Sequence, residues 1–417
     1  MLKRLIALVE DDWGPHVGSL LRRSLRWFLA DGVFGGASDA IVNAFQALYF
    51  LALGATRPQI GLLASLSNLT MPLAMFPGAA LAERSVEYKR FILKALIFSK
   101  STLFLLALLP FIPFSGYAIS FGIGIATLRV FASHFANPAW TALVGKLVPL
   151  QWRGRYFASR NILIGLASVL VTLLAGGLID LLGSPGGYQV VFGLAGILGL
   201  LSAYSFARIE EPLMAQRRTQ NLSTKAVLKF TGRIPGFLPF CILSGLWNFS
   251  VHLAAPFFPV YMVEGFKAGG TLIGLTSSLA ILASIPGQRI FGRQADERGA
   301  LWVQRLTSLV IPFIPWLWAL APGVWFIIPV ELFSGFIWAG FNLAVFNLLL
   351  ELTPEEGRPV HVALYQVISG LGMTIGPVIG GLLANALGYK ALFWISGALR
   401  VLIAILFIHF LREGSRP

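Results

Sequence analysis

The chain has 417 residues, of which 56% are hydrophobic and only 12% are charged, and its mean hydropathy is +0.77. Soluble globular domains carry about 25% charged residues, so this composition excludes an ordinary soluble protein. The net charge of +14 could suggest a nucleic-acid partner. The positions of the basic residues, described below, indicate membrane topology instead, and we expect no nucleic acid to bind.

Apolar stretches of about 20 residues, long enough to cross a bilayer as helices, recur from one end of the chain to the other. About twelve spans are predicted on this criterion. They cover residues 25–52, 57–82, 91–112, 117–145, 160–182, 188–208, 235–262, 270–291, 303–321, 324–350, 361–386 and 390–411. We therefore predict an all-α membrane protein with twelve transmembrane helices.

The first 24 residues begin with a short apolar run, Leu5 to Val9, which is followed at once by Glu10, Asp11 and Asp12. This run is too short for a cleaved signal peptide. Residues 1–24 are predicted to form an amphipathic segment on the cytoplasmic leaflet, with a frayed tail as the alternative. The single cysteine, Cys241, lies in a predicted span and permits no internal disulfide.

The chain carries an internal repeat displaced by about half its length. Ile60-Gly61-Leu62, Gly78, Glu83-Arg84 and Arg90 reappear as Ile273-Gly274-Leu275, Gly292, Glu297-Arg298 and Arg305. One strongly polar connector, residues 210–234, separates the two copies. The predicted organisation is a six-helix half over 25–209, a linker over 210–234 and a second six-helix half over 235–417.

Basic residues fall in the N-terminus and in alternate loops, with Arg57, Lys267 and Lys390 as the exceptions on the other side. By the positive-inside rule this asymmetry places both termini and the linker in the cytoplasm. The cytoplasmic set is Lys3, Arg4, Arg22, Arg23, Arg26, Arg84, Lys89, Arg90, Lys146, Arg153, Arg155, Arg217, Arg218, Lys225, Lys229 and Arg233. The expected location is the cell membrane.

The segment after the eighth span, Gly292 to Gly299, resembles the Gly-x-x-x-Asp-x-x-Gly loop of the major facilitator superfamily of secondary transporters. Its first-half counterpart around Gly78 and Glu83 is degraded. Residues 149–156 resemble the family's Arg-Gly-Arg entry to the fifth span, and only the second arginine recurs in the second half. The glycine-proline motif that antiporters carry in the fifth span occurs here at 372–381, in the eleventh.

This resemblance implies that acidic and basic residues on the cytoplasmic side form contacts that break as the two halves rock. The candidate gating residues are Glu83, Arg84, Arg90, Arg153, Arg155, Gly292, Asp296, Arg298, Gly299 and Arg358. The resemblance also implies that spans one, four, seven and ten line a central cavity.

The first predicted span carries two carboxylates, Asp31 and Asp39, and the fourth carries Arg129. A charge inside a span is costly and normally faces a cavity or a partner. Arg129 resembles the arginine of a family motif associated with proton coupling, although Ala132 and Ser133 replace the following glutamine and glycine. We expect Asp39 and Arg129 to be partners, and one aspartate to exchange a proton while Arg129 competes for it. A fixed ion pair that only joins two helices is the alternative.

Polar and aromatic residues in the spans that line the cavity could bind an organic solute. The candidates are Asn43, His134, Trp247, Asn248, His252, Glu331, Trp338 and Asn342. Packing or interfacial anchoring is the alternative role for the tryptophans and histidines. Lys100 and Arg400, near the middle of spans three and twelve, have no role in this scheme.

The expected function is secondary transport of a small organic solute by alternating access, coupled to protons and with export slightly favoured. An uptake symporter for a sugar or metabolite, and a non-transporting receptor or assembly protein on the same fold, are the alternatives. No phosphate-binding loop or metal-spaced His/Cys cluster occurs, so we expect neither an enzyme nor a cofactor. The expected partners are the solute, protons and the lipid bilayer, and the expected state is a monomer.

Overall fold

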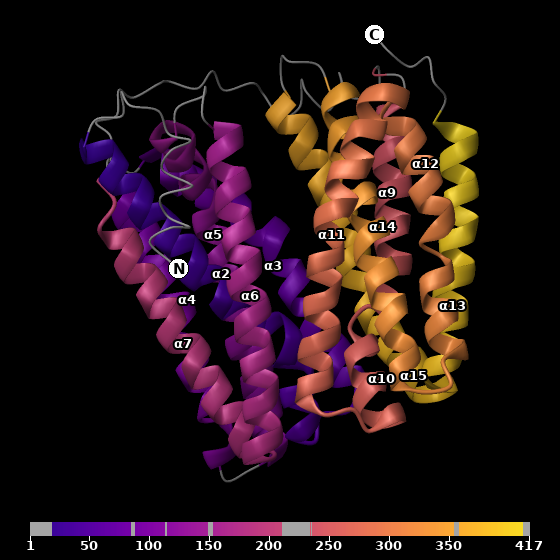
Figure 1. Ribbon diagram of the computed structural model, residues 1–417, viewed down its shortest axis with the longest axis horizontal. Helices are drawn as coiled ribbons and strands as arrows, with labels where there is room; N and C mark the ends of the chain where they lie inside the picture. The colour runs from indigo at the N-terminus through magenta and orange to yellow at the C-terminus, as the bar shows by residue number, and fades with distance from the viewer. Residues whose placement is uncertain are drawn as a thin grey trace. The chain divides into compact units, whose positions relative to one another are not determined.

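The computed structural model describes residues 19–84, 88–112, 115–148, 153–210, 234, 236–353 and 358–411. Within these residues the chain is built from helices, with one short 3-10 turn (Figure 1). The predicted N-terminal segment lies outside the described residues up to position 18, and the linker lies outside them over 211–233. The first helix begins at Ser19, before the predicted start at residue 25.

The first half of the chain supplies six long helices and the turn η1 (Leu109–Phe111). The helices are α2 (Ser19–Ala52), α3 (Arg57–Arg84), α4 (Tyr88–Ala107), α5 (Ser115–Leu147), α6 (Arg153–Leu182) and α7 (Gly186–Ala207). Each corresponds to one predicted span, although α4 ends at Ala107, before the predicted end of its span at residue 112. Several extend beyond the span because helix continues past the apolar stretch into the flanking polar residues.

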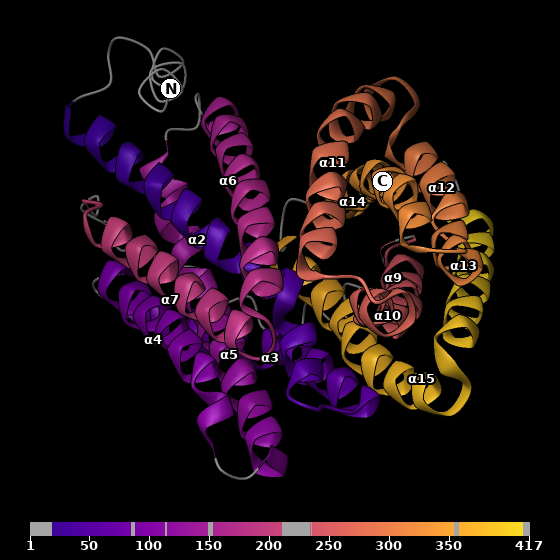
Figure 2. The same cartoon turned by 60° about the horizontal axis from the view of Figure 1, so that its bottom comes forward.

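In the second half, two predicted spans are built from two consecutive helices each. The helices are α9 (Phe237–Ala254), α10 (Phe257–Phe266), α11 (Gly270–Arg298), α12 (Ala300–Val310), α13 (Phe313–Leu320), α14 (Val324–Glu351) and α15 (Arg358–Phe410). The breaks fall before Pro256 and Pro312, whose rings fix φ and remove a backbone donor. The long helix α15 covers the last two predicted spans and turns back at Gly388, where φ is 81° (Figure 2).

Nine helical segments in the described part of the chain are long and apolar enough to cross a membrane. One of them, His361–Phe410, contains both final spans of the prediction. The helices α2 and α4 are not among the nine, and they carry the intramembrane charges Asp31, Asp39 and Lys100. The all-α membrane fold predicted from the sequence is confirmed.

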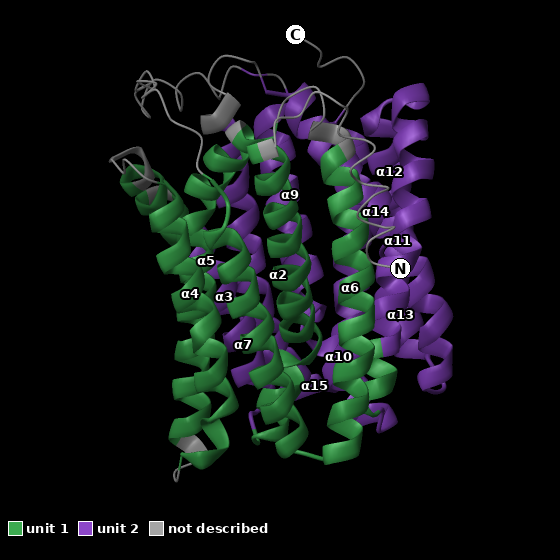
Figure 3. Cartoon of the chain, turned by 60° about the vertical axis from the view of Figure 1, so that its left-hand side comes forward, with its two compact units in different colours: residues 1–54, 73–216, 269–274 green, residues 55–72, 217–268, 275–417 purple. Residues whose placement is uncertain are grey.

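The helices pack into two compact units (Figure 3). Unit 1 comprises residues 1–54, 73–216 and 269–274, and unit 2 comprises 55–72, 217–268 and 275–417. These boundaries differ from the division at the linker because the starts of α3 and α11 each pack with helices of the other half of the chain.

Close backbone contacts explain both exchanged segments. In unit 2, a Cβ on Gly61 would collide with the backbone of α15 at Pro377, and Asn68 donates a hydrogen bond to the carbonyl of Met373 over 2.7 Å. In unit 1, a Cβ on Gly274 would lie 2.7 Å from the carbonyl oxygen of Thr172. Only glycine lets the helix backbones approach this closely.

The segment predicted as a loop after the eighth span, Gly292 to Gly299, is helical as far as Arg298. The Nε of Arg293 donates to Oε1 of Glu297 over 2.6 Å, one turn along α11. The chain then turns at Gly299, where φ is 89°, a conformation that favours glycine. The motif therefore places its polar residues on the last turns of a helix, and the connecting turn is confined to its last residue.

Candidate functional site

The intramembrane charges predicted in the first half of the chain lie in or beside one cavity of unit 1. This cavity has a volume of about 360 Å³ and is lined by residues of α2, α4, α5, α6 and α7. Both aspartates of α2 border it, together with Lys100 and Arg160. The glycines Gly32, Gly35 and Gly36 form the α2 wall between the two aspartates, so neighbouring side chains can lie directly against the helix.

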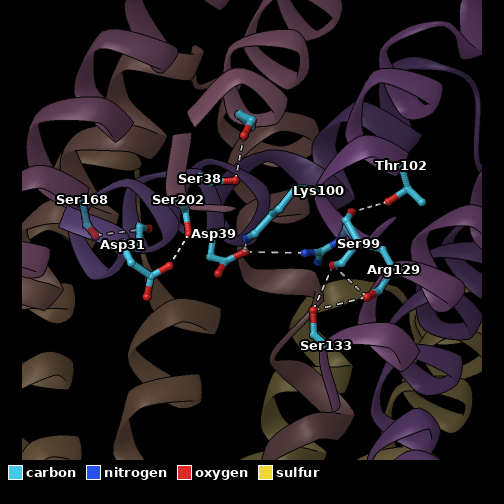
Figure 4. Close-up of polar contacts among 12 residues, drawn as sticks. Asp31, Ser38, Asp39, Ser99, Lys100, Thr102, Arg129, Ser133, Ser168 and Ser202 are labelled. Atoms are coloured by element: carbon cyan, nitrogen blue, oxygen red, sulfur yellow. Dashed lines mark hydrogen bonds and ion pairs between the residues drawn. The ribbon is translucent and has the colours of Figure 1, made fainter. Parts of the chain in front are cut away.

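Asp39 makes two ion contacts, and both use its Oδ1 atom (Figure 4). The Nζ of Lys100 lies 2.7 Å away and donates a hydrogen bond. The Nη1 of Arg129 lies at 3.6 Å, in ion-pair range but beyond hydrogen-bond distance. The predicted pairing of Asp39 with Arg129 is therefore present in the structure, but Lys100 is the closer partner.

The three members of this cluster differ sharply in exposure. The side chain of Asp39 is 50% exposed, whereas those of Lys100 and Arg129 are 4% and 9% exposed. The second carboxylate oxygen of Asp39 points away from both cations (Figure 4). Among the described residues, the other oxygen of Asp39 makes no ion contact, and Asp39 lines the cavity while its cations are held in the helix packing.

Lys100 is fixed by a glycine on the neighbouring helix. A Cβ added to Gly199 of α7 would lie 2.6 Å from Cδ of Lys100, so the lysine stem rests on the α7 backbone. On the α5 side, the Oγ of Ser99 donates a hydrogen bond to the carbonyl of Arg129 over 3.0 Å. These contacts hold α4 between α5 and α7 and keep the ammonium group at the height of Asp39.

The second aspartate, Asp31, has its own partners and is buried. The Oγ of Ser202 donates to Oδ1 of Asp31 over 2.7 Å, and Nη2 of Arg160 lies 3.8 Å from Oδ2. Arg160 also stacks on the ring of Phe28, with 4.4 Å between its Cζ and the ring centroid. Asp31 is 7% exposed, so it is held in the packing more firmly than Asp39.

The two remaining first-half candidates lie on the helices that carry Asp39 and Arg129. Asn43, one turn beyond Asp39 on α2, is exposed, and His134 on α5 is half-buried. Three residues pair with Asp39 or Asp31 although the sequence did not suggest it: Lys100, Arg160 and Ser202. Depth along a span could be estimated from sequence, but the helix face on which each side chain lies could not.

The second-half candidates belong to unit 2 and divide into two groups. Trp247 is buried, with its ring 4.9 Å from that of Phe341, and His252 and Asn248 bond to backbone carbonyls one turn earlier on α9. These are packing contacts. Trp338 and Asn342, in contrast, line a cavity of about 770 Å³ between α11 and α14. Glu331 lies nearer the start of α14 and is half-buried.

The gating candidates are only partly described by the structure. Asp296 and Arg298 are exposed near the end of α11, and Arg298 lies over the ring of Trp302, 4.6 Å from its centroid. Arg90 is exposed on α4. The side chains of Glu83, Arg84, Arg153, Arg155 and Arg358 lie outside the described set, so the proposed cytoplasmic contacts stay a prediction.

Curated relatives include multidrug efflux proteins. The chain is 32% identical over 172 residues to a "Multi-drug resistance efflux pump PmrA homolog" of Lactococcus lactis subsp. lactis, a match that covers 40% of this chain and 42% of the relative. It is 25% identical over 181 residues to "Multidrug resistance protein MdtG" of Salmonella choleraesuis, covering 42% and 44%. The matched stretch thus spans less than half the length of these relatives.

Solved structures of similar fold include proteins named as transporters and symporters. The nucleoside transporter NupG superposes with a TM-score of 0.74 at 13% identity, over 93% of this chain and 100% of that one. The D-xylose-proton symporter superposes with a TM-score of 0.73 at 14% identity, over 95% and 99%. At these identities the likeness concerns the fold alone.

The family model described as "Major Facilitator Superfamily" matches the chain twice, over residues 28–254 and 240–417. Together the two matches cover nearly the whole sequence and correspond to the repeat seen in it. The chain belongs to the Major Facilitator Superfamily.

Proposed function

We propose that this protein exports a small organic solute across the cell membrane by alternating access, driven by proton entry. The observation that carries the proposal is the carboxylate of Asp39, half exposed to a cavity of about 360 Å³ while its two cations are buried. Ionisable groups within spans are costly and commonly mark ion pathways. The efflux pumps among the relatives favour the outward direction.

In this mechanism the ion cluster around Asp39 exchanges a proton as the protein changes state. Asp39 and Asp31 are the candidate carriers, and Arg129 competes with the proton for the carboxylate. A conformational change that alters the distances within the cluster changes the affinity for the proton, and so couples protonation to conformation. A proton-linked cycle then moves solute outward as protons move inward.

The proposal also includes the topology, the cytoplasmic contacts and the part of the solute site that lies in the second half. The termini lie in the cytoplasm, and the polar residues at the end of α11, including Asp296 and Arg298, form cytoplasmic contacts that break as the halves rock. Trp338 and Asn342 offer a ring face and an amide to the solute from the second half. The protein acts as a monomer and as a transporter, without enzymatic chemistry.

The proposal is tested in inside-out vesicles, whose lumen corresponds to the cell exterior. Tetraphenylphosphonium is the probe, and the membrane potential is held at zero with potassium and valinomycin. An acidic lumen should drive accumulation of the probe, and nigericin should abolish it. Asp39→Asn should reduce the initial rate at least about tenfold, because the ion cluster loses its carboxylate. Full transport by Asp39→Asn would exclude Asp39.

Two alternatives give different results in the same assay. An uptake symporter would accumulate its solute in right-side-out vesicles with acid outside, and the amides of unit 2 favour testing a sugar such as xylose there. A non-transporting receptor or assembly protein would move no probe in either orientation. Either result would replace export as the proposed function.

A further inference from the structure

We propose that the proton exchanged by this chain is carried by Lys100, which releases it when a monocationic organic solute pairs with the exposed carboxylate of Asp39. The inference rests on the proposed proton-coupled export. It adds the class of substrate, and it assigns the proton to Lys100 in place of the carboxylates of Asp31 and Asp39. It assigns a role to a lysine that the sequence left without one.

The contact between the two residues joins a buried donor to an exposed acceptor. The Nζ of Lys100 lies 2.7 Å from Oδ1 of Asp39, with the lysine 4% and the aspartate 50% exposed. Because both ion contacts of Asp39 use Oδ1, its other oxygen is available to a cation in the cavity (Figure 4). A solute can therefore reach Asp39 without first displacing Lys100.

The charges near the cavity make a second cation unfavourable unless one positive charge leaves. The charged groups are the carboxylates of Asp31 and Asp39 on α2 and the cations Lys100 on α4, Arg129 on α5 and Arg160 on α6, a surplus of one positive charge. His134 is the further titratable group on α5. Entry of a monocation doubles this surplus in a region of low dielectric constant, where like charges repel strongly.

Among the three cations, only Lys100 can restore the balance by losing a proton. Guanidinium groups remain protonated in proteins, whereas a buried lysine ammonium can become neutral. In the proposed step the N–H bond of the Lys100 ammonium breaks and its electron pair stays on Nζ as a neutral amine. The proton passes to cavity water, and the solute cation replaces the ammonium as the charge partner of Asp39. The total charge of the site is the same before and after.

The position of Lys100 is suited to this step. Its stem lies against Gly199, so the side chain is fixed by packing and does not depend on the ion pair to stay in place. When the ammonium becomes neutral, the amine remains beside Asp39 and can take up a proton again after the solute leaves. A flexible surface lysine would instead move into solvent.

The test measures protons released when a probe binds to the purified full-length protein. Tetraphenylphosphonium is the monocation, tetraphenylborate is the anion of matched shape, and triphenylphosphine oxide is a neutral aromatic control. Calorimetry in two buffers with different ionisation enthalpies gives the number of protons released per bound probe. The variants are Lys100→Arg, Lys100→Met and the control Lys94→Arg, which makes the same change at an exposed position on the same helix.

We expect the unchanged protein to bind the monocation with release of about one proton, so that its affinity for the monocation rises with pH. Lys94→Arg should behave in the same way. Lys100→Arg should bind without proton release, because the guanidinium keeps its charge, and Lys100→Met should bind more tightly and independently of pH. Thermal unfolding of each variant reports whether it is folded, and Lys100→Arg preserves the ion pair if Lys100→Met does not fold.

Proton release by Lys100→Arg equal to that of the unchanged protein would overturn the proposal and assign the proton to a carboxylate. Binding of tetraphenylborate in preference to tetraphenylphosphonium, or of neither, would overturn the cation site. Failure of the proposed function has a different signature. In that case vesicles would not transport the probe, yet proton release on binding would still depend on Lys100.

Discussion

The two copies of the internal repeat use the same packing but different charges. In unit 1, the ring centroids of Tyr49 on α2 and Tyr188 on α7 are 5.6 Å apart. In unit 2, those of Tyr261 on α10 and Tyr389 on α15 are 5.5 Å apart. A serine hydroxyl also joins the first and last spans of each copy. Ser38 of α2 donates to the carbonyl of Ala195 on α7, and Ser396 of α15 donates to the carbonyl of Ser250 on α9. The tyrosine pairs and these two hydrogen bonds give the same alignment of the two copies.

In that alignment, Val251 takes the position of Asp39 and Arg400 takes the position of Gly199. Arg400 is 1% exposed, its Nη2 lies 3.4 Å from the carbonyl of Val251, and its Nε has no hydrogen-bond partner among the described residues. Both copies therefore hold a buried cation beside the first helix of their half. At this place unit 1 pairs a carboxylate with a lysine, Asp39 with Lys100, whereas unit 2 places Arg400 against the backbone of Val251.

The two copies therefore share the aromatic and hydroxyl contacts that determine how their helices pack. Their charged residues differ. The chemistry proposed for coupling then belongs to unit 1. The cavity of unit 2 offers uncharged groups, among them Ser284, Gln288 and Asn342, to a solute.

The largest effect on stability is expected from removing the buried cation of unit 1, and the matched change in unit 2 should have little or no cost. Lys100→Met should lower the free energy of unfolding by about 3 kcal/mol, because Asp39 loses its charge-assisted hydrogen bond from the Lys100 ammonium. Arg400→Met should be neutral or stabilising, since an apolar chain replaces a charge that has no carboxylate partner among the residues that the structure describes. Thermal unfolding in detergent measures both, and equal losses for the two variants would contradict the comparison.

The next effect concerns the glycine beneath Lys100. Gly199→Ala places a methyl group 2.6 Å from the lysine stem, so we expect a loss of about 1 to 3 kcal/mol from overpacking and a weaker Lys100–Asp39 contact. Gly193→Ala on the same helix has open space around it and should change stability by less than about 1 kcal/mol. If both substitutions have the same effect, the glycine contact does not position Lys100.

Much of this arrangement could be predicted from the sequence, for identifiable reasons. Hydropathy located the spans because lipid requires long apolar helices, and the cost of intramembrane charge singled out Asp39 and Arg129. The closer contact of Asp39 with Lys100 than with Arg129 could not be predicted, because it depends on the rotation of α4 about its axis. An alignment of the sixth and twelfth spans would have supplied one signal, because Gly199 and Arg400 occupy the same position.

The partner of Asp31 and the helical form of Gly292 to Arg298 were missed for similar reasons. Arg160 lies at the very start of its predicted span, where an arginine suggests a lipid headgroup contact. The glycine and charged residues of the motif suggest a loop, but an i,i+4 ion pair between Arg293 and Glu297 supports the helix until Gly299. Local sequence patterns are weakest where a helix leaves the apolar region.

A smaller effect is expected at the start of α11 in unit 1, where Asp180 of α6 accepts hydrogen bonds from the first backbone amides. The distances are 2.6 Å from the nitrogen of Gly270 and 2.9 Å from that of Thr271. Asp180→Ala should cost about 1 kcal/mol, as for the loss of a helix cap. Asp180→Asn keeps an acceptor oxygen and should recover part of the loss in thermal unfolding, and no recovery would indicate that the negative charge is what matters.

The smallest effect is expected at the corresponding junction of unit 2, which has the opposite charge. Here Arg57, at the start of α3, pairs with Glu264 over 2.9 Å and donates to the carbonyl of Ala384, also over 2.9 Å. Both side chains of the pair are about one third exposed, at 32% and 31%. Arg57→Gln should therefore cost less than about 1 kcal/mol, and the cost should fall as salt rises, because exposed ion pairs are screened.

Asp180→Ala, which removes backbone caps, should show a weaker dependence on salt. Thermal unfolding of both variants across a salt series measures this, and an equal dependence would mean that the two junctions are stabilised in the same way despite their opposite charges.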